Sequence, residues 1–227
     1  LSSEWASAQG TTMQPPLSIS VKDYYNPTLN FKQFMIPALM TMVLIMLCGL
    51  LPALNIVSEK EVGTIEQINV TPVPKAAFIL SKLIPYWVMG FVILTICFIL
   101  SWLVYSYTPS GSFITIYIAA TLFTLVMSGI GLIISNYAAS MQQALFIMFF
   151  FIMIFMLMSG LFTDVRSMPD WAQDIAFFNP PRYFINMMRS VFQRGGDIID
   201  NNHNFVMLAI FAFIANIWAV MSYRKQA

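Results

Sequence analysis

Side chains that could carry acid–base, nucleophilic or metal chemistry are few in this sequence. The 227 residues include one histidine, His203, and two cysteines, Cys48 and Cys97. His203 stands alone at the edge of an apolar segment, and both cysteines fall within apolar segments, where they behave as small apolar residues. Neither a metal-binding spacing nor a Walker-type G-x-x-x-x-G-K-[ST] loop occurs. We therefore predict no catalytic residue, no metal and no cofactor, and we expect that the chain cannot hydrolyse ATP alone.

A cluster of charges lies in the segment Ser58–Pro72, which holds Glu59, Lys60, Glu61 and Glu66 between two long apolar segments. In a sequence that is 59% hydrophobic and only 9% charged, such a cluster must lie outside the lipid bilayer. We therefore expect this segment to be the place where a soluble partner pushes on the membrane-embedded part of the protein.

Within this segment, the residues Thr64-Ile65-Glu66-Gln67 fit a capping box, in which the threonine side chain caps a helix start and the glutamine reaches back to its amide. Gly63 permits a sharp turn just before the box, and Pro72 ends the segment. Ile65 and Ile68 share one face. The pattern predicts a short helix that lies across the membrane surface. An ordinary solvated loop is the alternative, because T-x-x-Q boxes are common.

The composition fixes the fold class. A mean hydropathy of +0.75, with 20 Phe and 17 Met, excludes a soluble globular protein, and the net charge of +1 gives no indication of nucleic acid binding. From Leu83 to Thr163 no Asp, Glu, Lys or Arg occurs, and this run alone holds roughly three spans. Helices satisfy their backbone polar groups internally, as a bilayer demands. The sequence predicts an all-α, polytopic membrane protein with five transmembrane helices at residues 34–57, 77–107, 113–135, 143–162 and 204–223.

The links between these spans predict how the helices are arranged. Residues 108–112 and 136–142 form short links, so the helices they join are expected to be antiparallel neighbours. Pro52 is expected to bend the first span, and Pro85 to kink or begin the membrane part of the second. An odd number of spans puts the two chain ends on opposite sides. Cationic residues close to span ends favour a cytoplasmic location for the 58–75 loop and the C-terminal tail.

Three further patterns concern the connection before the last span, the packing of the spans and a run of aromatic residues. The 164–202 connection mixes aromatic and charged side chains, which suits short helices at the water–lipid boundary, with a plain extracellular loop as the alternative. Gly131 and Ser135 form a small-x-x-x-small pair, which predicts close helix packing. The aromatic residues at 149–151 either line a pathway for an apolar substrate or face lipid and core.

The loop Glu59–Pro72 resembles the first cytoplasmic loop of ABC-2-type transporter permeases. The resemblance covers nearly the whole chain and keeps its order. Its other parts are Tyr25-Asn26-Pro27, Lys82–Tyr86, Gly129–Ser135 with Gln142-Gln143-Ala144, Ser159–Phe162 followed by Met168–Trp171, and Asn179–Phe184 leading to Arg189. One departure is Asp164, where relatives often carry proline. The nearest relatives are expected to be bacterial drug-efflux-type permeases.

The family pattern implies six spans, with a large extracytoplasmic domain between the first and the second. Residues 1–32 are then the end of that domain, and residues 33–227 are the ABC-2-type transmembrane domain. We expect the sequence to lack its true N-terminus, because it begins without methionine or a signal-peptide pattern. The resemblance also places the protein in the bacterial plasma (inner) membrane as a multi-pass protein.

The resemblance implies two sets of functional residues. The first is the ATPase-coupling loop, whose short helix seats in a groove of the ATPase subunit: Glu59, Glu61, Gly63, Thr64, Glu66, Gln67, Thr71 and Pro72. The second is an amphipathic, re-entrant external gate before the last span: Gly160, Met168, Pro169, Trp171, Pro180, Tyr183 and Arg189.

We therefore predict the membrane-spanning permease subunit of an ATP-driven ABC exporter that moves an amphipathic or hydrophobic, drug-like substrate out of the cell. The partners implied are an ABC ATPase subunit that hydrolyses ATP, a second permease chain, identical or related, a periplasmic adaptor protein and the lipid bilayer, with no nucleic acid. The alternatives are a membrane-embedded lipid-modifying enzyme, which the single histidine and nearly charge-free spans oppose, and a non-transporting assembly subunit.

Overall fold

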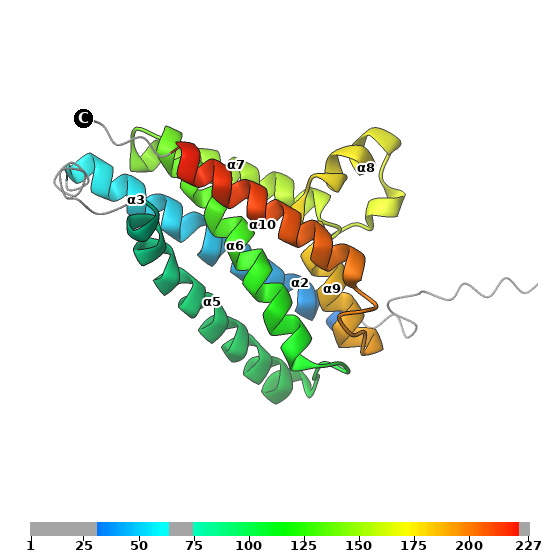
Figure 1. The fold of residues 1–227 in the computed structure, drawn as a ribbon. Helices are drawn as coiled ribbons and strands as arrows, with labels where there is room; N and C mark the ends of the chain where they lie inside the picture. Colours follow the sequence, from blue (N-terminus) through cyan, green and yellow to red (C-terminus); the bar gives the residue numbers. More distant parts are fainter. Residues whose placement is uncertain (1–30, 64–74, 223–227) are drawn as a thin grey trace, which may run out of the picture.

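The computed structural model describes residues 31–63 and 75–222. Within these ranges the chain forms helices, turns and short links, and no strand. Five helices are long and apolar enough to cross a membrane, which confirms the predicted all-α polytopic fold (Figure 1). The predicted surface helix at residues 64–72 and the N-terminal segment 1–30 lie outside the described residues.

The first span is built from three consecutive helical pieces: α2 (Phe31–Ile45), the π-helix η1 (Met46–Leu50) and α3 (Leu51–Val62). Pro52 explains the π-helical turn. A proline in a helix lacks an N–H, and its ring collides with the carbonyl four residues earlier, here that of Cys48 in η1. The wider π-helical turn relieves this collision, so the distortion expected at Pro52 takes this form.

The other four spans are α5 (Lys75–Tyr105), α6 (Phe113–Tyr137), α7 (Met141–Met158) and α10 (Asn202–Ser222). α5 passes through Pro85 as one helix. α6 is the most buried of the spans, and it packs against the first span, α5, α7 and α10. The arrangement in Figure 1 therefore has α6 at its centre, with α5 the most peripheral span.

Small residues let α6 come close to its neighbours. A Cβ atom added to Gly131 would lie 2.4 Å from the carbonyl oxygen of Gly49 in η1, and one added to Gly129 would lie 3.1 Å from the Cβ of Ala215 in α10. The backbones thus approach to distances that side chains would prevent, as the small-residue pattern around Gly131 predicts.

α7 ends at Met158, four residues before the predicted end of the fourth span at residue 162. Gly160 has φ of 83°, in the left-handed region that stops a helix. The Ser159 hydroxyl donates to the carbonyl oxygen of Met156 (2.9 Å) and accepts from the N–H of Leu161 (3.3 Å). The chain therefore turns away from the α7 axis here, and residues 159–163 form a link.

Three short helices follow before the last span: η2 (Val165–Ser167), α8 (Asp170–Phe177) and α9 (Pro180–Arg194). α8 projects from the bundle and exposes Trp171, Ile175 and Phe177, as expected of a helix at the water–lipid boundary (Figure 1). α9 does not lie at such a boundary. It is buried along its length between α2, α6 and α10.

The depth of α9 makes it a re-entrant helix. Its Phe184 ring stacks on Phe123, with centroids 4.3 Å apart. Phe123 lies ten residues into α6, which is about 15 Å along the helix axis. At the other end of α9, the N–H of Gly111, in the link between α5 and α6, donates to the carbonyl oxygen of Val191 (3.0 Å). α9 therefore runs from the middle of the bundle back to its outer end.

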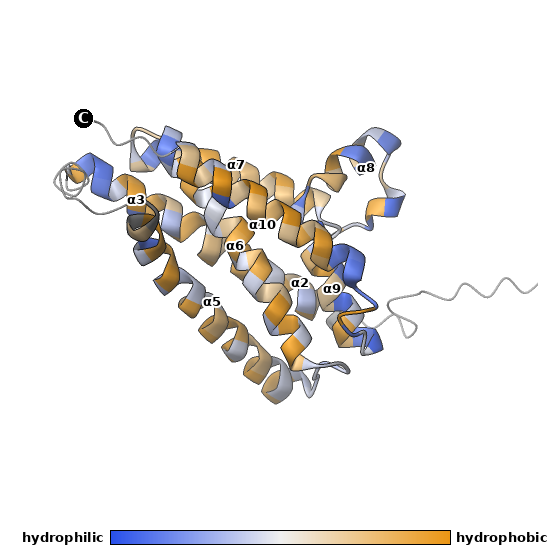
Figure 2. Cartoon of the chain, in the orientation of Figure 1, coloured by the Kyte–Doolittle hydropathy of each residue, from blue (hydrophilic) through white to orange (hydrophobic). Residues whose placement is uncertain are grey.

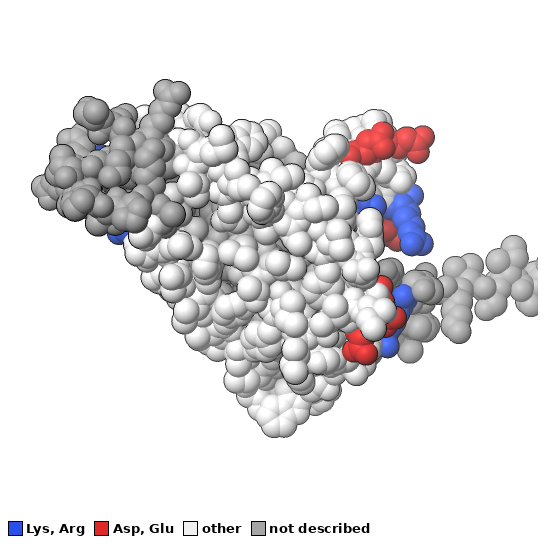
Figure 3. All heavy atoms as spheres, in the orientation of Figure 1, with Lys and Arg blue, Asp and Glu red and all other residues white. Residues whose placement is uncertain are grey.

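Charged residues gather at the two ends of the bundle, and apolar residues cover its length (Figure 2). Figure 3 shows the acidic and basic side chains of α8, η2, the end of α9 and the turn before α10 at one end, separated from the other end by a surface without charge. The opposite end carries the last turn of α3, the first turns of α5 and the end of α10.

Candidate functional site

The last turn of α3 holds the charged residues Glu59, Lys60 and Glu61. The sequence placed them in a loop after a span ending at residue 57, whereas the helix continues to Val62. Glu and Lys favour helices, and no helix-breaking residue lies between Pro52 and Gly63. Gly63 then ends the helix with φ of 80°, and its N–H donates to the carbonyl oxygens of Glu59 and Lys60.

Glu59 connects α3 to α5. Its carboxylate forms an ion pair with the ammonium group of Lys82, which lies two turns into α5. Both side chains are largely shielded from solvent, at 23% and 29% exposure. Such partial burial weakens screening by salt, so this pair holds the two helices together more firmly than a fully exposed pair does.

Lys60 connects α3 to the end of α6. Its ammonium group donates to the carbonyl oxygens of Ser135 and, at 3.1 Å, of Asn136. Both belong to the last turn of α6, where carbonyls have no partner within the helix. A cation is favoured here because the C-terminus of a helix carries partial negative charge.

Glu61 connects α3 to the start of α7. Its carboxylate accepts from the backbone N–H of Met141 (2.9 Å), the first residue of that helix. Ser140 caps the same terminus, because its hydroxyl accepts from the N–H of Gln143 (3.2 Å). The Gln143 side chain in turn accepts from the N–H of Ala139 (2.9 Å), one residue before the Ser140 N–H that a capping box would use.

The end of α6 is also tied to α10. The side-chain amide of Asn136 donates to the carbonyl oxygen of Ala219 (3.1 Å) and to the hydroxyl of Ser222 (2.7 Å). The same residue accepts from Lys60 through its backbone. A continuous set of polar contacts therefore runs from α3 through the end of α6 to the end of α10.

Three consecutive side chains of α3 thus reach three different helices. Successive residues of an α-helix point about 100° apart, so Glu59, Lys60 and Glu61 face in three directions. They meet α5, α6 and α7, respectively. We call this set, together with Lys82, Asn136 and Met141, the α3 hub. The last turn of α3 therefore contacts three other spans directly.

The sequence identified part of this arrangement. Glu59, Glu61 and Gly63 lie at the hub, whereas Thr64, Glu66, Gln67, Thr71 and Pro72 fall outside the described residues. Lys60, Lys82 and Asn136 were not among the predicted site residues. The S-x-x-Q box at Ser140–Gln143 was a signal in the sequence that could have indicated a helix start facing this end.

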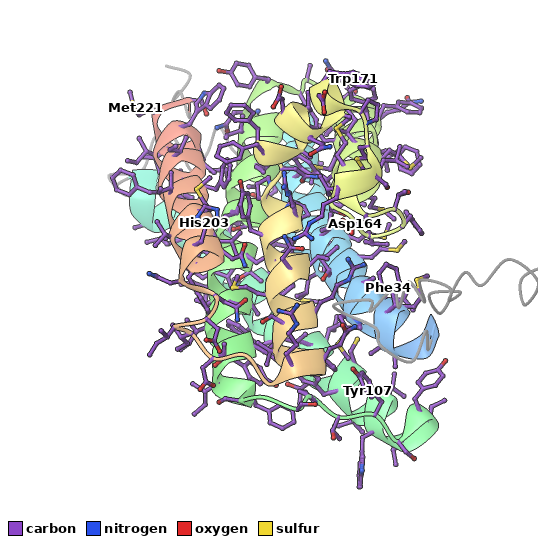
Figure 4. The ribbon with its side chains drawn as sticks, turned by 90° about the vertical axis from the view of Figure 1, so that its right-hand side faces the viewer. Phe34, Tyr107, Asp164, Trp171, His203 and Met221 are labelled. Atoms are coloured by element: carbon purple, nitrogen blue, oxygen red, sulfur yellow. The ribbon has the colours of Figure 1, made fainter. Side chains whose placement is uncertain are left out.

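At the opposite end of the bundle lie the residues predicted for the external gate. Gly160 turns the chain after α7, and Val165 packs against it, with a Cβ at Gly160 only 3.2 Å from a Val165 methyl group. Met168 and Pro169 precede α8, and the Met168 carbonyl oxygen accepts from the side chain of Gln173 (2.8 Å). Trp171 projects from α8 (Figure 4).

The other predicted gate residues lie on α9. Pro180 begins the helix, where a proline has no N–H to leave unpaired. Tyr183 is buried and its hydroxyl donates to the carbonyl oxygen of Phe177 in α8 (2.8 Å). Burial raises the pKa of the Tyr183 hydroxyl above its ordinary value, and the charge of Arg182 partly opposes that increase.

Arg189 is a buried cation that joins three segments. Its guanidinium donates to the carbonyl oxygen of Leu161 (3.3 Å) and lies 4.0 Å from the ring centroid of Phe34 in α2. The first contact holds the link after α7, and the second is a cation–π interaction with the start of the first span. Arg189 therefore fastens the re-entrant helix to both.

The two predicted sets do not come together. The hub lies at one end of the bundle and the gate residues lie at the other, so any communication between them runs along the spans. His203, at the start of α10, packs edge-on against the ring of Tyr183, with centroids 6.2 Å apart (Figure 4). Among the described residues, no group of three His, Cys, Asp or Glu side chains is placed to hold a metal ion.

Comparison with known protein families agrees with this architecture. The family model described as ABC-2 family transporter protein matches residues 6–220, nearly the entire chain. The chain belongs to this family. It is a multi-pass membrane protein, since five of its helices are suited to span a bilayer.

Several proteins of Escherichia coli K12 are similar to this ABC-2 chain. The probable multidrug ABC transporter permease YbhR is 29% identical over 184 residues, which is 80% of this chain and 50% of YbhR. The probable multidrug ABC transporter permease YbhS is 27% identical over 219 residues, 94% of this chain and 57% of YbhS. The inner membrane transport permease YhhJ is 25% identical over 188 residues, 80% and 49%. The chain spans about half the length of these relatives.

Proposed function

We propose that this chain forms part of the membrane-spanning permease of an ATP-driven exporter in a bacterial inner membrane. A separate ABC ATPase subunit binds and hydrolyses ATP, and it acts on the permease through residues 59–72. Nucleotide binding biases the spans between an inward-open and an outward-open arrangement. The family supports this proposal, as do the three relatives, each of which is named a permease.

One structural observation carries the proposal: consecutive charged residues at the end of α3 contact three other spans. An exporter needs a small region where a soluble motor moves several helices together. The α3 hub fits that need, because the predicted coupling segment continues directly from Gly63. A segment that contacted only its own helix would have no such means of moving the bundle.

The substrate that we propose is amphipathic or hydrophobic and drug-like. Two of the relatives are named probable multidrug permeases, and residues 34–61, 79–105, 113–137, 141–158 and 202–222, the membrane-crossing parts of the five spans, carry charge only at the α3 hub. Spans without charge offer apolar contacts to a substrate and disfavour a small ion. We propose further that two permease chains, identical or related, assemble in the exporter, with the gate residues of α8 and α9 closing its outer side.

Co-purification with the cognate ABC ATPase tests the proposal. The full-length permease is expected to retain the ATPase, and the variants Gly63→Pro and Glu66→Lys are expected to lose it. Proline cannot adopt the φ of 80° at Gly63 and has no N–H to donate to the carbonyls of α3. Asp170→Lys, the same type of charge reversal on exposed α8, is the matched control and should retain the ATPase. Binding that survives both loop variants would refute coupling through 59–72.

A further inference from the structure

We propose that Lys60 and Glu61 are positioning residues that attach the α6–α7 link to α3 through the opposite charges of two helix ends. A push on α3 then moves the link, and α10 with it. This inference rests on the proposed coupling through residues 59–72. It goes further by naming the side chains that distribute the movement and the signs of charge that they require.

The required signs follow from the contacts. Lys60 lies against the C-terminal carbonyls of α6, where unpaired acceptors and partial negative charge favour a cation. Glu61 lies against the N–H of Met141, where unpaired donors and partial positive charge favour an anion. The two helix ends cannot change sign, because the backbone sets their polarity. Exchanging Lys60 and Glu61 therefore places like charges together at both contacts.

This property distinguishes these residues from the neighbouring pair. In the pair of Glu59 and Lys82 both charges belong to side chains, so exchanging them keeps an attraction. At Lys60 and Glu61 only one member of each contact is a side chain. Each contact is also a hydrogen bond to an ionised group, which is stronger and more directional than one between neutral groups.

The link passes the movement on to the last span. Residues 138–140 join α6 to α7, with Ser140 capping the start of α7. Asn136 holds the end of α6 to Ala219 and Ser222 of α10. A link that follows α3 therefore carries the inner ends of α6, α7 and α10 together. If the link is released from α3, the inner ends of α6, α7 and α10 do not move, even though the ATPase still displaces α3.

Distances between paired spin labels test this directly and need no knowledge of the substrate. Cysteines replace Val62, at the end of α3, Tyr137, at the end of α6, and Ile199, at the outer end, which are 74%, 67% and 88% exposed. Cys48 and Cys97 are changed to alanine (Cys48→Ala, Cys97→Ala), as is any cysteine elsewhere in the full-length permease. The full-length permease is reconstituted with its ATPase, and the 62–199 and 137–199 distances are measured without nucleotide and after trapping with ATP, magnesium and vanadate.

In the parent protein both distances are expected to shift on trapping. In the charge-exchanged variant Lys60→Glu with Glu61→Lys, the 62–199 shift should remain and the 137–199 shift should be lost. Net charge and composition are unchanged, so neither explains the loss. Lys60→Arg with Glu61→Asp, which keeps both signs, should retain both shifts. If the exchanged variant does not fold, Lys60→Gln replaces it in the same distance measurement. The 137–199 shift should again be lost.

A 137–199 shift that persists in the exchanged variant or in Lys60→Gln would overturn the inference while leaving the proposed function intact. The same applies if the conservative variant loses the shift, because geometry and not charge would then hold the link. If neither distance shifts in the parent although the ATPase is bound, the proposed coupling itself fails, and the inference fails with it.

Discussion

Gly131 lies where α6 meets the backbone of η1. A methyl group at this position would sit 2.4 Å from the Gly49 carbonyl oxygen, and that oxygen belongs to backbone that cannot rotate away as a side chain does. The pair of helices would have to separate, and the neighbouring contact of Gly129 with Ala215 on the other side of α6 limits where α6 can go. The residue is therefore fixed by packing and not by any chemistry of its own.

Gly131→Ala is expected to destabilise the bundle by about 1–3 kcal/mol, the usual cost of overpacking. Thermal unfolding of the detergent-solubilised protein, followed by loss of monodisperse material, measures the effect. Ser135→Ala is the control from the same motif. It removes only a hydrogen bond to the carbonyl oxygen of Leu132 in its own helix, so a smaller change is expected. Equal stability of Gly131→Ala and the parent would contradict the close approach.

Arg189 holds the re-entrant helix α9 to the link after α7 and to the start of the first span. Its guanidinium satisfies the Leu161 carbonyl oxygen and covers the Phe34 ring. Methionine has a similar length but no donors and no charge, so Arg189→Met should release the link after α7. We expect faster cleavage by chymotrypsin at Phe162, which is already exposed at the surface of this link.

The matched control for Arg189→Met is Arg194→Met, which removes the same charge from an exposed position at the end of the same helix. Cleavage at Phe162 should then remain at the parent rate. If both variants are cleaved equally fast, loss of positive charge and not loss of the Leu161 and Phe34 contacts controls the link.

At the scale of helices, α7 depends on its cap. Its first N–H groups have no partners within the helix, and they are satisfied by Glu61 and by Ser140. Ser140→Ala is expected to cost about 1 kcal/mol, the typical loss on removing a serine cap. Ser112→Ala is a close control, because Ser112 precedes α6 in the same way but makes no capping hydrogen bond. A thermal stability loss in Ser112→Ala equal to that in Ser140→Ala would contradict a specific role for the cap.

The environment of the helices in residues 164–202 could not be predicted well from the sequence. The alternation of aromatic and charged residues over 164–202 was interpreted as one environment, whereas α8 is exposed and α9 is buried. The difference arises from partners distant in the sequence. The Phe184 ring of α9 stacks on Phe123 of α6. Arg189 of α9 contacts the Phe34 ring of α2 and the carbonyl oxygen of Leu161 in the link after α7. No local pattern contains these partners, so composition alone could not separate the two helices.

The α3 hub shows the same limit for the site. Residues 59–61 were singled out because charges are rare, and this depends on composition, which the sequence displays fully. Lys82 and Asn136 were missed as partners because their roles depend on which helix ends meet in space. Helix ends could be estimated only to within a few residues, and the end of α3 at Val62 decided whether these charges belong to a helix or a loop.

Over the whole molecule, five spans followed from hydropathy alone, because a bilayer selects apolar helices of about 20 residues irrespective of their tertiary contacts. The 25 residues of α6 rise about 38 Å, which exceeds the hydrocarbon thickness of about 30 Å. The hub and the gate residues around α8 are therefore expected at opposite membrane surfaces, and the three spans that separate them along the chain, α5, α6 and α7, agree with that expectation.

Labelling with a membrane-impermeant maleimide tests this topology in a Cys48→Ala, Cys97→Ala background. Val62→Cys, beside the hub, should react only in inside-out vesicles, because the coupling ATPase requires a cytoplasmic hub. Ile199→Cys, at the start of the last span, should react only in right-side-out vesicles. Phe213→Cys, exposed on the middle of α10, faces lipid and should react in neither.

Reaction of Val62→Cys and Ile199→Cys from the same side would show that the described helices do not cross the bilayer as a five-span bundle. Reaction of each from the other side would invert the protein and remove the hub from the reach of the ATPase.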